Sequence, residues 1–304
     1  MKKISLLFIC FLMLQNLFAQ DLCVATYNIR NKNSRDSVNG NEWQKRCAVL
    51  CSQINYEQPD VLGTQEVLHS QLIDMLNALD GYGYIGVGRE DGKQSGEYAA
   101  VFYKKDRIEL EDSGHFWLNE QTDVPLKGWD AACVRICTWG RFKEKQSGKI
   151  FYMFNLHMDH VGVEARQKSS ELVVRKIKET AKDNPAVLTG DFNVDQTDGI
   201  YTIFTQSQLL SDCYTSARLK FITNGTFNNF NSDVTTSSRI DHIFVTKHFY
   251  VDRYAVLTDG YWDKSYADDS EKAVDAPKEI QFKKSKRRLP SDHYPVFARL
   301  RFNP

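Results

Sequence analysis

The stretch Ala186-Val187-Leu188-Thr189-Gly190-Asp191-Phe192-Asn193 joins a short apolar run to polar residues at its carboxyl end. The apolar run follows a segment of helical periodicity at about 162–182, so we expect a buried strand after a long helix. Asp191 and Asn193 lie where that strand ends, at a place where a fold by itself requires only turn-forming residues. The same pattern, an apolar strand that ends in polar side chains, recurs along the rest of the chain.

Strand-like and helix-like segments alternate on both sides of this stretch. We expect helices at 41–58, where Pro59 stops the helix, and at 67–79 and 162–182. We expect the strands at 21–30, 61–63, 82–87, 98–104, 134–142, 150–157, 186–189, 240–245, 250–257 and 294–301. Strands that alternate with long helices predict sheets covered by helices, an α/β or α+β sandwich. Without a repeat or a linker in residues 21–304, we expect this part to form a single domain.

The first 20 residues have the pattern of a signal peptide. Lys2 and Lys3 precede an apolar run that extends to Phe18 and then becomes polar, and the run is too short to span a bilayer comfortably. We therefore expect cleavage near residue 20, export to the periplasm or the extracellular space, no stable membrane anchor, and a monomer.

The charges of the chain balance. Its 39 basic and 39 acidic residues give a formal charge of zero, so no global positive field attracts nucleic acid or membrane, and any polyanion must be bound locally. The polar segment 262–289 is basic in its second half, and we expect it to be a surface loop. It is either a solvated face or a phosphate contact, because it directly precedes Ser291-Asp292-His293.

Polar side chains at strand ends are the feature that a plain fold does not explain. Each of them alone has a structural explanation as a turn former, a helix cap or a core histidine. A fold does not need three aspartates, one glutamate, two asparagines and two histidines at strand edges, and together they predict one active site. These residues are Asn28, Glu66, His157, Asp191, Asn193, Asp241, Asp292 and His293.

Six motifs occur in an order that resembles the endonuclease/exonuclease/phosphatase superfamily, the deoxyribonuclease I-like enzymes. They are Tyr27-Asn28-Ile29-Arg30, Gln65-Glu66, Asn155-Leu156-His157, Gly190-Asp191-Phe192-Asn193, Arg239-Ile240-Asp241-His242 and Ser291-Asp292-His293-Tyr294-Pro295-Val296. The resemblance extends from residue 24 to about 300. It implies a four-layer α/β/β/α sandwich, in which two mixed β-sheets are flanked by helices. The segments 128–139 and 157–162, with Arg166, resemble secreted bacterial members related to the deadenylase branch.

The chemistry of a phosphate ester explains these residue types. The enzyme must neutralise phosphoryl oxygens, activate a water molecule and stabilise the leaving oxygen, and a hard divalent ion on oxygen ligands does much of this. We expect Mg²⁺ or Mn²⁺ as the cofactor, with Glu66 as its first ligand. By resemblance, Asn28 and Asp292 complete or support the same site. No cysteine is needed, so zinc is not favoured.

The resemblance also implies the catalytic roles. Asp191 lies next to the attacking water, and Asn193 holds either Asp191 or a phosphoryl oxygen. His293 donates to a phosphoryl oxygen, with Asp241 accepting from its other ring nitrogen, and His157 is a second donor.

Three further residues are candidates for binding the substrate. Arg30 is either a phosphate contact or a surface arginine. Trp129 and Arg135 suit a base or a sugar phosphate in the cleft, but tryptophan and arginine also serve as packing residues.

Our leading hypothesis is therefore a divalent-metal-dependent hydrolase of phosphate esters. Within this class, we favour a nuclease-like phosphodiesterase. The alternatives are an exported phosphodiesterase or phosphatase of the same fold that acts on a phospholipid or a sugar phosphate, and a non-catalytic exported binding module. The superfamily acts on DNA, RNA, phosphoinositides and sphingomyelin, so the fold alone does not choose between them.

Overall fold

Both faces of the first strand, β1 (Asp21–Asn28), are buried. Leu22 and Val24 belong to one apolar cluster, whereas Ala25 and Tyr27 belong to another. Successive side chains of a strand point to opposite faces, so this strand lies in a sheet that is covered on both sides. The structure is a computed structural model, which describes residues 21–304 apart from 264–269, 273 and 276. The predicted signal peptide lies outside the described residues.

The first sheet is mixed, because β1 pairs in parallel with β2 and antiparallel with β17. Two helices, α3 (Trp43–Glu57) and α4 (His69–Ala78), cover its outer face, where Leu50 and Met75 belong to the same apolar cluster as Phe102. The strand order is β10 (Leu219–Phe221), β12 (Phe249–Val256), β17 (Val296–Phe302), β1, β2 (Val61–Gln65), β4 (Val101–Lys104) and β3 (Tyr82–Ile85).

The second sheet is also mixed, with β7 parallel to β8 and its other neighbouring strands antiparallel. Helices α5 (Val163–Ala181) and α6 (Tyr201–Thr205) cover its outer face, where Val173 and Phe204 pack in the same cluster as Leu188. The strand order is β5 (Ile108–Trp117), β6 (Ile136–Glu144), β7 (Ile150–His157), β8 (Ala186–Asp191), β11 (Asp241–Val245) and β9 (Ser211–Asp212).

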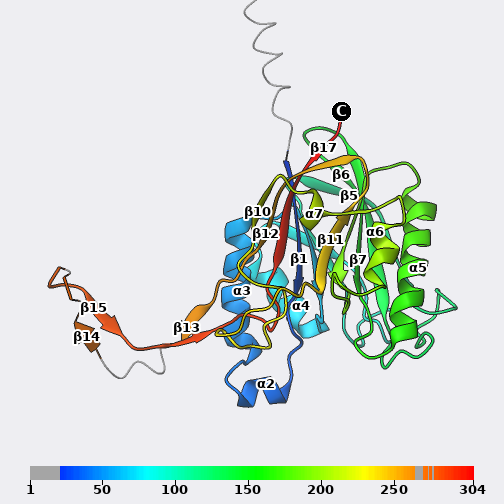
Figure 1. The fold of residues 1–304 in the computed structure, drawn as a ribbon. Helices are drawn as coiled ribbons and strands as arrows, with labels where there is room; N and C mark the ends of the chain where they lie inside the picture. Colours follow the sequence, from blue (N-terminus) through cyan, green and yellow to red (C-terminus); the bar gives the residue numbers. More distant parts are fainter. Residues whose placement is uncertain (1–20, 264–269, 273, 276) are drawn as a thin grey trace, which may run out of the picture.

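The two sheets lie face to face, with the apolar cluster of Leu22 and Val24 between them. Val24 and Val61 of the first sheet pack in this cluster with Phe151 and Val187 of the second. The order of layers is therefore helix, sheet, sheet, helix (Figure 1). This confirms the predicted four-layer sandwich of two mixed sheets. Among the described residues, no helix is both long enough and apolar enough to cross a bilayer.

Polar side chains replace apolar ones in one layer between the sheets. Asn155 of β7 donates from Nδ2 to the backbone oxygens of Thr64 (2.9 Å) and Ala100 (3.0 Å), and Gln65 Nε2 donates to Asn155 Oδ1 (2.7 Å). Asn155 also accepts from Thr189 Oγ1 at 3.0 Å. Buried hydrogen bonds of this kind fix one relative position of the two sheets.

Parts of the chain differ from the sequence-based expectation. The strand β5 was not predicted, because its polar sequence at the edge of a sheet lacks an apolar run. The short helices α2 (Ser34–Val38) and α7 (Cys213–Ser216) were also not predicted.

The segment expected to be a surface loop contains two short pairs of strands. β13 (Tyr261–Asp263) pairs with β16 (Lys286–Arg288), and β14 (Ser270–Lys272) pairs with β15 (Gln281–Lys283). They form an arm that projects from the body of the protein (Figure 1).

Candidate active site

The carboxyl ends of parallel strands bring the predicted residues together. Asn28 ends β1 and Glu66 directly follows β2, while His157 and Asp191 end β7 and β8. Because each pair of strands is parallel, both members end at the same edge of their sheet. The two edges meet where Asn28 Nδ2 donates to Asp191 Oδ2 at 3.0 Å.

Residues that directly follow these strands adopt left-handed backbone conformations. The φ angles are +57° at Arg30, +62° at Glu66 and +48° at Asn193, and Asn229 (+52°) and Phe230 (+57°) share this conformation. Residues other than glycine rarely adopt this backbone conformation, because it costs about 1 kcal/mol or more per residue. All five residues line one cavity. They are five of the ten described non-glycine residues with positive φ, and backbone strain of this kind often occurs at functional sites.

This cavity has a volume of about 640 Å³, a size typical of sites for small molecules. Asn28 and Asp241 are fully buried beneath its lining. The predicted residue Trp129 does not line the cavity. It is partly buried against the apolar cluster of Val173 and Leu188, beneath α5. The predicted residues that line the cavity are Arg30, Glu66, Arg135, His157, Asp191, Asn193, Asp292 and His293.

Asp191 is held by donors on both carboxylate oxygens. Its Oδ2 accepts from Asn28, and its Oδ1 accepts from the backbone N–H of Asn193 at 3.0 Å. Burial raises the pKa of Asp191 and the nearby Asp241 carboxylate adds to this, while His293 acts in the opposite direction. A carboxylate with a raised pKa suits the acceptance of a proton from water.

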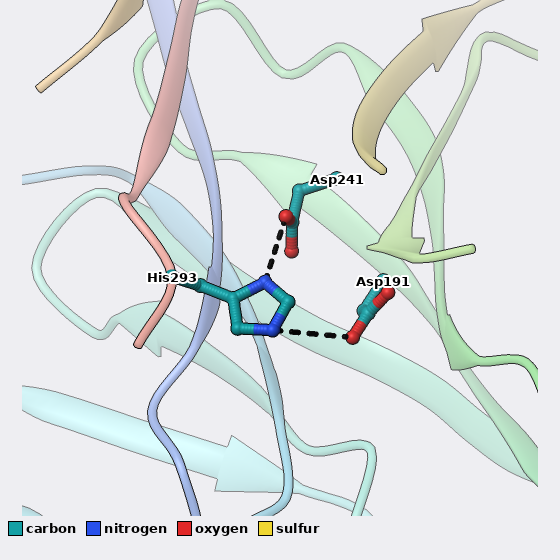
Figure 2. Close-up of side chains that lie close together, drawn as sticks. All are labelled: Asp191, Asp241 and His293. Carbon is teal, nitrogen blue, oxygen red and sulfur yellow. Dashed lines mark hydrogen bonds and ion pairs between the residues drawn. The ribbon is translucent and has the colours of Figure 1, made fainter. Parts of the chain in front are cut away.

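His293 lies between two carboxylates (Figure 2). Its Nδ1 is 2.9 Å from Asp241 Oδ2, and its Nε2 is 3.7 Å from Asp191 Oδ2. Burial lowers the pKa of His293, but the two carboxylates outweigh burial and raise it. The imidazole is therefore held as a cation, the form that donates from both nitrogens.

The pKa of His157 shifts in the opposite direction from that of His293. Burial lowers its pKa well below the usual value, and the positive charges of Arg135 and Arg89 lower it further. Its Nε2 lies 3.2 Å from Asn193 Nδ2 and 3.4 Å from Asp191 Oδ2. Asp191 Oδ2 thus lies near two histidines, one whose pKa is lowered and one whose pKa is raised.

The predicted metal ligands form a second group beside Asp191. Glu66 Oε1 accepts from Asn28 Nδ2 at 3.1 Å, and the guanidinium of Arg30 lies 3.4 Å from Asp292 Oδ2 and 3.9 Å from Glu66 Oε2. Burial raises the pKa of Asp292, and the negative charge of Glu66 adds to this effect. The two carboxylates are hard oxygen donors that suit Mg²⁺ or Mn²⁺. Asn28 differs from the prediction of a metal ligand, because its Nδ2 faces Glu66 and its Oδ1 accepts from the backbone N–H of Arg30 at 3.0 Å.

A second arrangement of ligating atoms occurs among the described residues. Atoms of Asp191, Asp241 and His293 lie within 4.8 Å of one another. Within this group His293 Nδ1 lies 2.9 Å from Asp241 Oδ2, so two of its members also hydrogen-bond to each other. Two groups of described residues, this one and the Glu66–Asp292 pair, thus offer ligand atoms to a divalent ion.

Both predicted substrate-binding arginines are anchored by carboxylates. Arg30 Nε donates to Asp36 Oδ2 at 2.8 Å. Arg135 Nε donates to Asp159 Oδ2 at 3.2 Å, and its Nη2 lies 3.0 Å from His160 Nδ1. Both guanidinium groups thus have fixed orientations at the cavity wall.

The sequence did not indicate Asn31, Arg89 or Glu97, although all three line the cavity. Arg89 and Glu97 lie on the loop between β3 and β4, away from the strand ends that marked the other residues. None of the basic residues from Lys283 to Arg288 lines the cavity.

Residues 25–293 match the model of the Endonuclease/Exonuclease/phosphatase family. An endonuclease/exonuclease/phosphatase family protein from Bacteroides thetaiotaomicron is 47% identical with a TM-score of 0.85, over 93% of this chain and 98% of that one. A mannosyl-6-phosphatase from the same organism is 47% identical with a TM-score of 0.84, over 92% of this chain and 100% of that one.

Nocturnin from Drosophila melanogaster is 25% identical over 179 residues, which are 55% of this chain and 27% of that protein. The chain spans 60% or less of the length of the two curated relatives that it matches.

Proposed function

The chain belongs to the Endonuclease/Exonuclease/phosphatase family, and from this we propose that it hydrolyses the phosphate monoester of a sugar with the help of a divalent cation. One observation carries this proposal. Asp191, two histidines whose pKa values shift in opposite directions, and the Glu66–Asp292 pair all line a single cavity of about 640 Å³. The arrangement contains an acceptor for the proton of water, donors for phosphoryl oxygens and oxygen ligands for a cation.

The residues divide the reaction between them. Asp191 accepts a proton from the attacking water, and the backbone N–H of Asn193 orients the carboxylate. His293, which Asp241 holds through Nδ1, donates to a phosphoryl oxygen from Nε2. His157 and Asn193 form a second set of groups beside the phosphate. Glu66 and Asp292 would hold the divalent cation, which would neutralise charge on the phosphate and on its leaving oxygen.

Three findings favour a monoester of a sugar over a nucleic acid. A relative that is 47% identical over 92% of this chain is a mannosyl-6-phosphatase. The cavity has the volume of a small-molecule site. The zero formal charge provides no long-range attraction for a polyanion. We therefore place the sugar phosphate ahead of the nuclease-like substrate that we expected from the sequence.

A phosphodiesterase is the second candidate, and aromatic residues in the cavity wall favour it. Phe227 is 40% exposed and packs edge-on against His293, with ring centroids 5.0 Å apart, and Phe230 lines the same wall. Aromatic faces of this kind can stack on the bases of a single strand.

The test compares three substrates with Mg²⁺ or Mn²⁺: mannose 6-phosphate, p-nitrophenyl phosphate and bis-p-nitrophenyl phosphate. We expect turnover of both monoesters, and a loss of kcat of about 1,000-fold in Asp191→Asn. Faster turnover of the diester would favour the second candidate. No turnover above that of Asp191→Asn would leave the non-catalytic binding module as the remaining hypothesis.

We propose in addition that the chain is exported after cleavage near residue 20 and acts as a monomer. The support is the pair Lys2 and Lys3 before an apolar run. N-terminal sequencing of the protein recovered from the periplasm and the medium tests the cleavage, and sedimentation tests the monomer.

A further inference from the structure

One wall of the cavity is formed by residues that have no assigned role in the proposed hydrolysis. Asn31, Arg89 and Glu97 line this wall, next to the proposed cation ligand Glu66. The backbone N–H of Asn31 donates to Glu66 Oε2 at 3.1 Å, and its side-chain Nδ2 donates to Glu97 Oε1 at 2.9 Å. A single residue therefore joins the cation ligand to Glu97.

The position of this wall relates it to the leaving group. In phosphoryl transfer, the attacking and leaving oxygens lie roughly in line on opposite sides of phosphorus. Under the proposed function the attacking water lies at Asp191, and a cation held by Glu66 would neutralise charge on the leaving oxygen, which places the leaving oxygen beside Glu66. The rest of the leaving group then extends toward Asn31 and Glu97.

The loop that carries Arg89 and Glu97 is braced independently of these two side chains. Asp91 Oδ1 accepts from the backbone N–H groups of Lys93 (2.7 Å) and Ser95 (2.9 Å), and Trp117 Nε1 donates to the backbone oxygen of Arg89 (2.7 Å). The backbone N–H of Arg89 donates to the backbone oxygen of Glu97 at 3.1 Å. The wall is thus preorganised, as a binding site requires.

The charges of this wall compensate one another. Arg89 Nη1 donates to Glu97 Oε2 at 2.5 Å, and their side chains are 12% and 16% exposed. The neighbouring Arg135 is neutralised by Asp159. A second phosphate would require cations without such partners, whereas hydroxyl groups need donors and acceptors side by side, which a guanidinium and a carboxylate provide.

We propose that Glu97 and Arg89, oriented by Asn31, bind hydroxyl groups of the leaving sugar and thereby determine which phosphate monoesters are hydrolysed. This inference rests on the proposed function of the site. It assigns Glu97 and Arg89 to substrate specificity, and Asn31 to the positioning of Glu97.

The test uses Glu97→Gln with two monoesters, only one of which carries sugar hydroxyls. We expect kcat/KM for mannose 6-phosphate to fall by roughly 10- to 100-fold, the range for a hydrogen bond to a charged group. We expect kcat/KM for p-nitrophenyl phosphate, and inhibition by inorganic phosphate, to change by less than about 3-fold, because the phosphate site is intact. Glu90→Gln is the matched control, because Glu90 lies exposed on the same loop outside the cavity lining and should leave both substrates unaffected.

Two outcomes would overturn the inference. An equal loss for both monoesters would mean that Glu97 acts on the phosphate, the cation or the fold, and a thermal melt of the variant identifies the last case. Unchanged selectivity in Glu97→Gln would mean that the pair only braces the loop. The proposed function itself fails in a different way, if the unsubstituted protein hydrolyses neither monoester with Mg²⁺ or Mn²⁺, and the inference then fails with it.

Discussion

Asn28 and Asp191 are separated by 163 positions in the chain, and a hydrogen bond of 3.0 Å joins their side chains. The same amide nitrogen donates to Glu66 Oε1 at 3.1 Å. Asn28 belongs to the first sheet and Asp191 to the second. One buried amide therefore links the proposed proton acceptor to the proposed cation ligand across the interface between the sheets.

Replacing Asn28 with alanine should separate these two groups. We expect kcat to fall by about 100-fold, because a displacement of about 1 Å in a catalytic group has an effect of this size. We also expect a loss of about 1–3 kcal/mol in the free energy of unfolding, because buried carboxylates lose a donor. Steady-state kinetics and denaturant unfolding measure the two effects. Asn184→Ala is the control, because Asn184 donates only to the backbone oxygen of Ala181, and a wild-type kcat in Asn28→Ala would contradict the proposed link.

Binding of the divalent cation should be visible without any assay of activity. An ion that binds only the folded state stabilises it by about 2.7 kcal/mol at about 100 times Kd, which raises Tm by roughly 5 °C in a protein of this size. We expect Mg²⁺ or Mn²⁺ to raise Tm, EDTA to reverse the rise, and Glu66→Gln to abolish it. Glu179→Gln, on the exposed surface of α5, should keep the full response. A shift of the same size in Glu66→Gln would place the ion elsewhere.

Asp159 should make the free energy of unfolding depend on pH in the acid range. Burial alone would raise its pKa, but the backbone N–H groups of Gly162 (2.8 Å) and Val161 (3.0 Å) and the charge of Arg135 lower it well below the usual value. A pKa that is lower in the folded state contributes stability above about pH 4, and this contribution is lost as the pH falls through the folded-state pKa.

The comparison of Asp159→Asn with the unsubstituted protein tests this dependence. We expect the free energy of unfolding to differ by about 3 kcal/mol near neutral pH, because Arg135 then loses its buried partner. The difference should shrink steadily below about pH 4. Denaturant unfolding at several pH values measures it, and a gap that stays constant down to acid pH would disprove the role of the charge.

Gly63 in β2 has no room for a side chain. A Cβ atom at this position would lie 2.4 Å from both Asn155 Oδ1 and Thr189 Oγ1, in the polar layer between the sheets. We expect Gly63→Ala to lower the free energy of unfolding by about 1–3 kcal/mol, the usual cost of overpacking. Gly199→Ala is the matched control, since a Cβ there meets no atom within 4 Å, and it should be neutral or slightly stabilising. Equal stability of the two variants would show that the sheets can move apart.

Much of the candidate site could be predicted, because its main residues lie next to an end of an apolar strand. Asp191 and Asn193 after β8, and Glu66 after β2, could be recognised by this position alone, and the structure places all three at one cavity. Trp129 shows the limit of this reasoning, because its residue type suits both a cleft and a core, and it packs against the core. Arg89 and Glu97 could not be predicted, because no strand end marks them.

The sequence by itself determined the layers of this protein, because the period of apolar residues decides which segments become strands and helices and which of their faces are buried. It also determined which chemical groups stand at the strand ends. Only the tertiary structure decided the partners of these groups: His293 between Asp241 and Asp191, and Asn31 between Glu66 and Glu97. The physical reason is that these contacts depend on the pairing of distant strands and on the packing of one sheet against the other, and local periodicity carries no information about either.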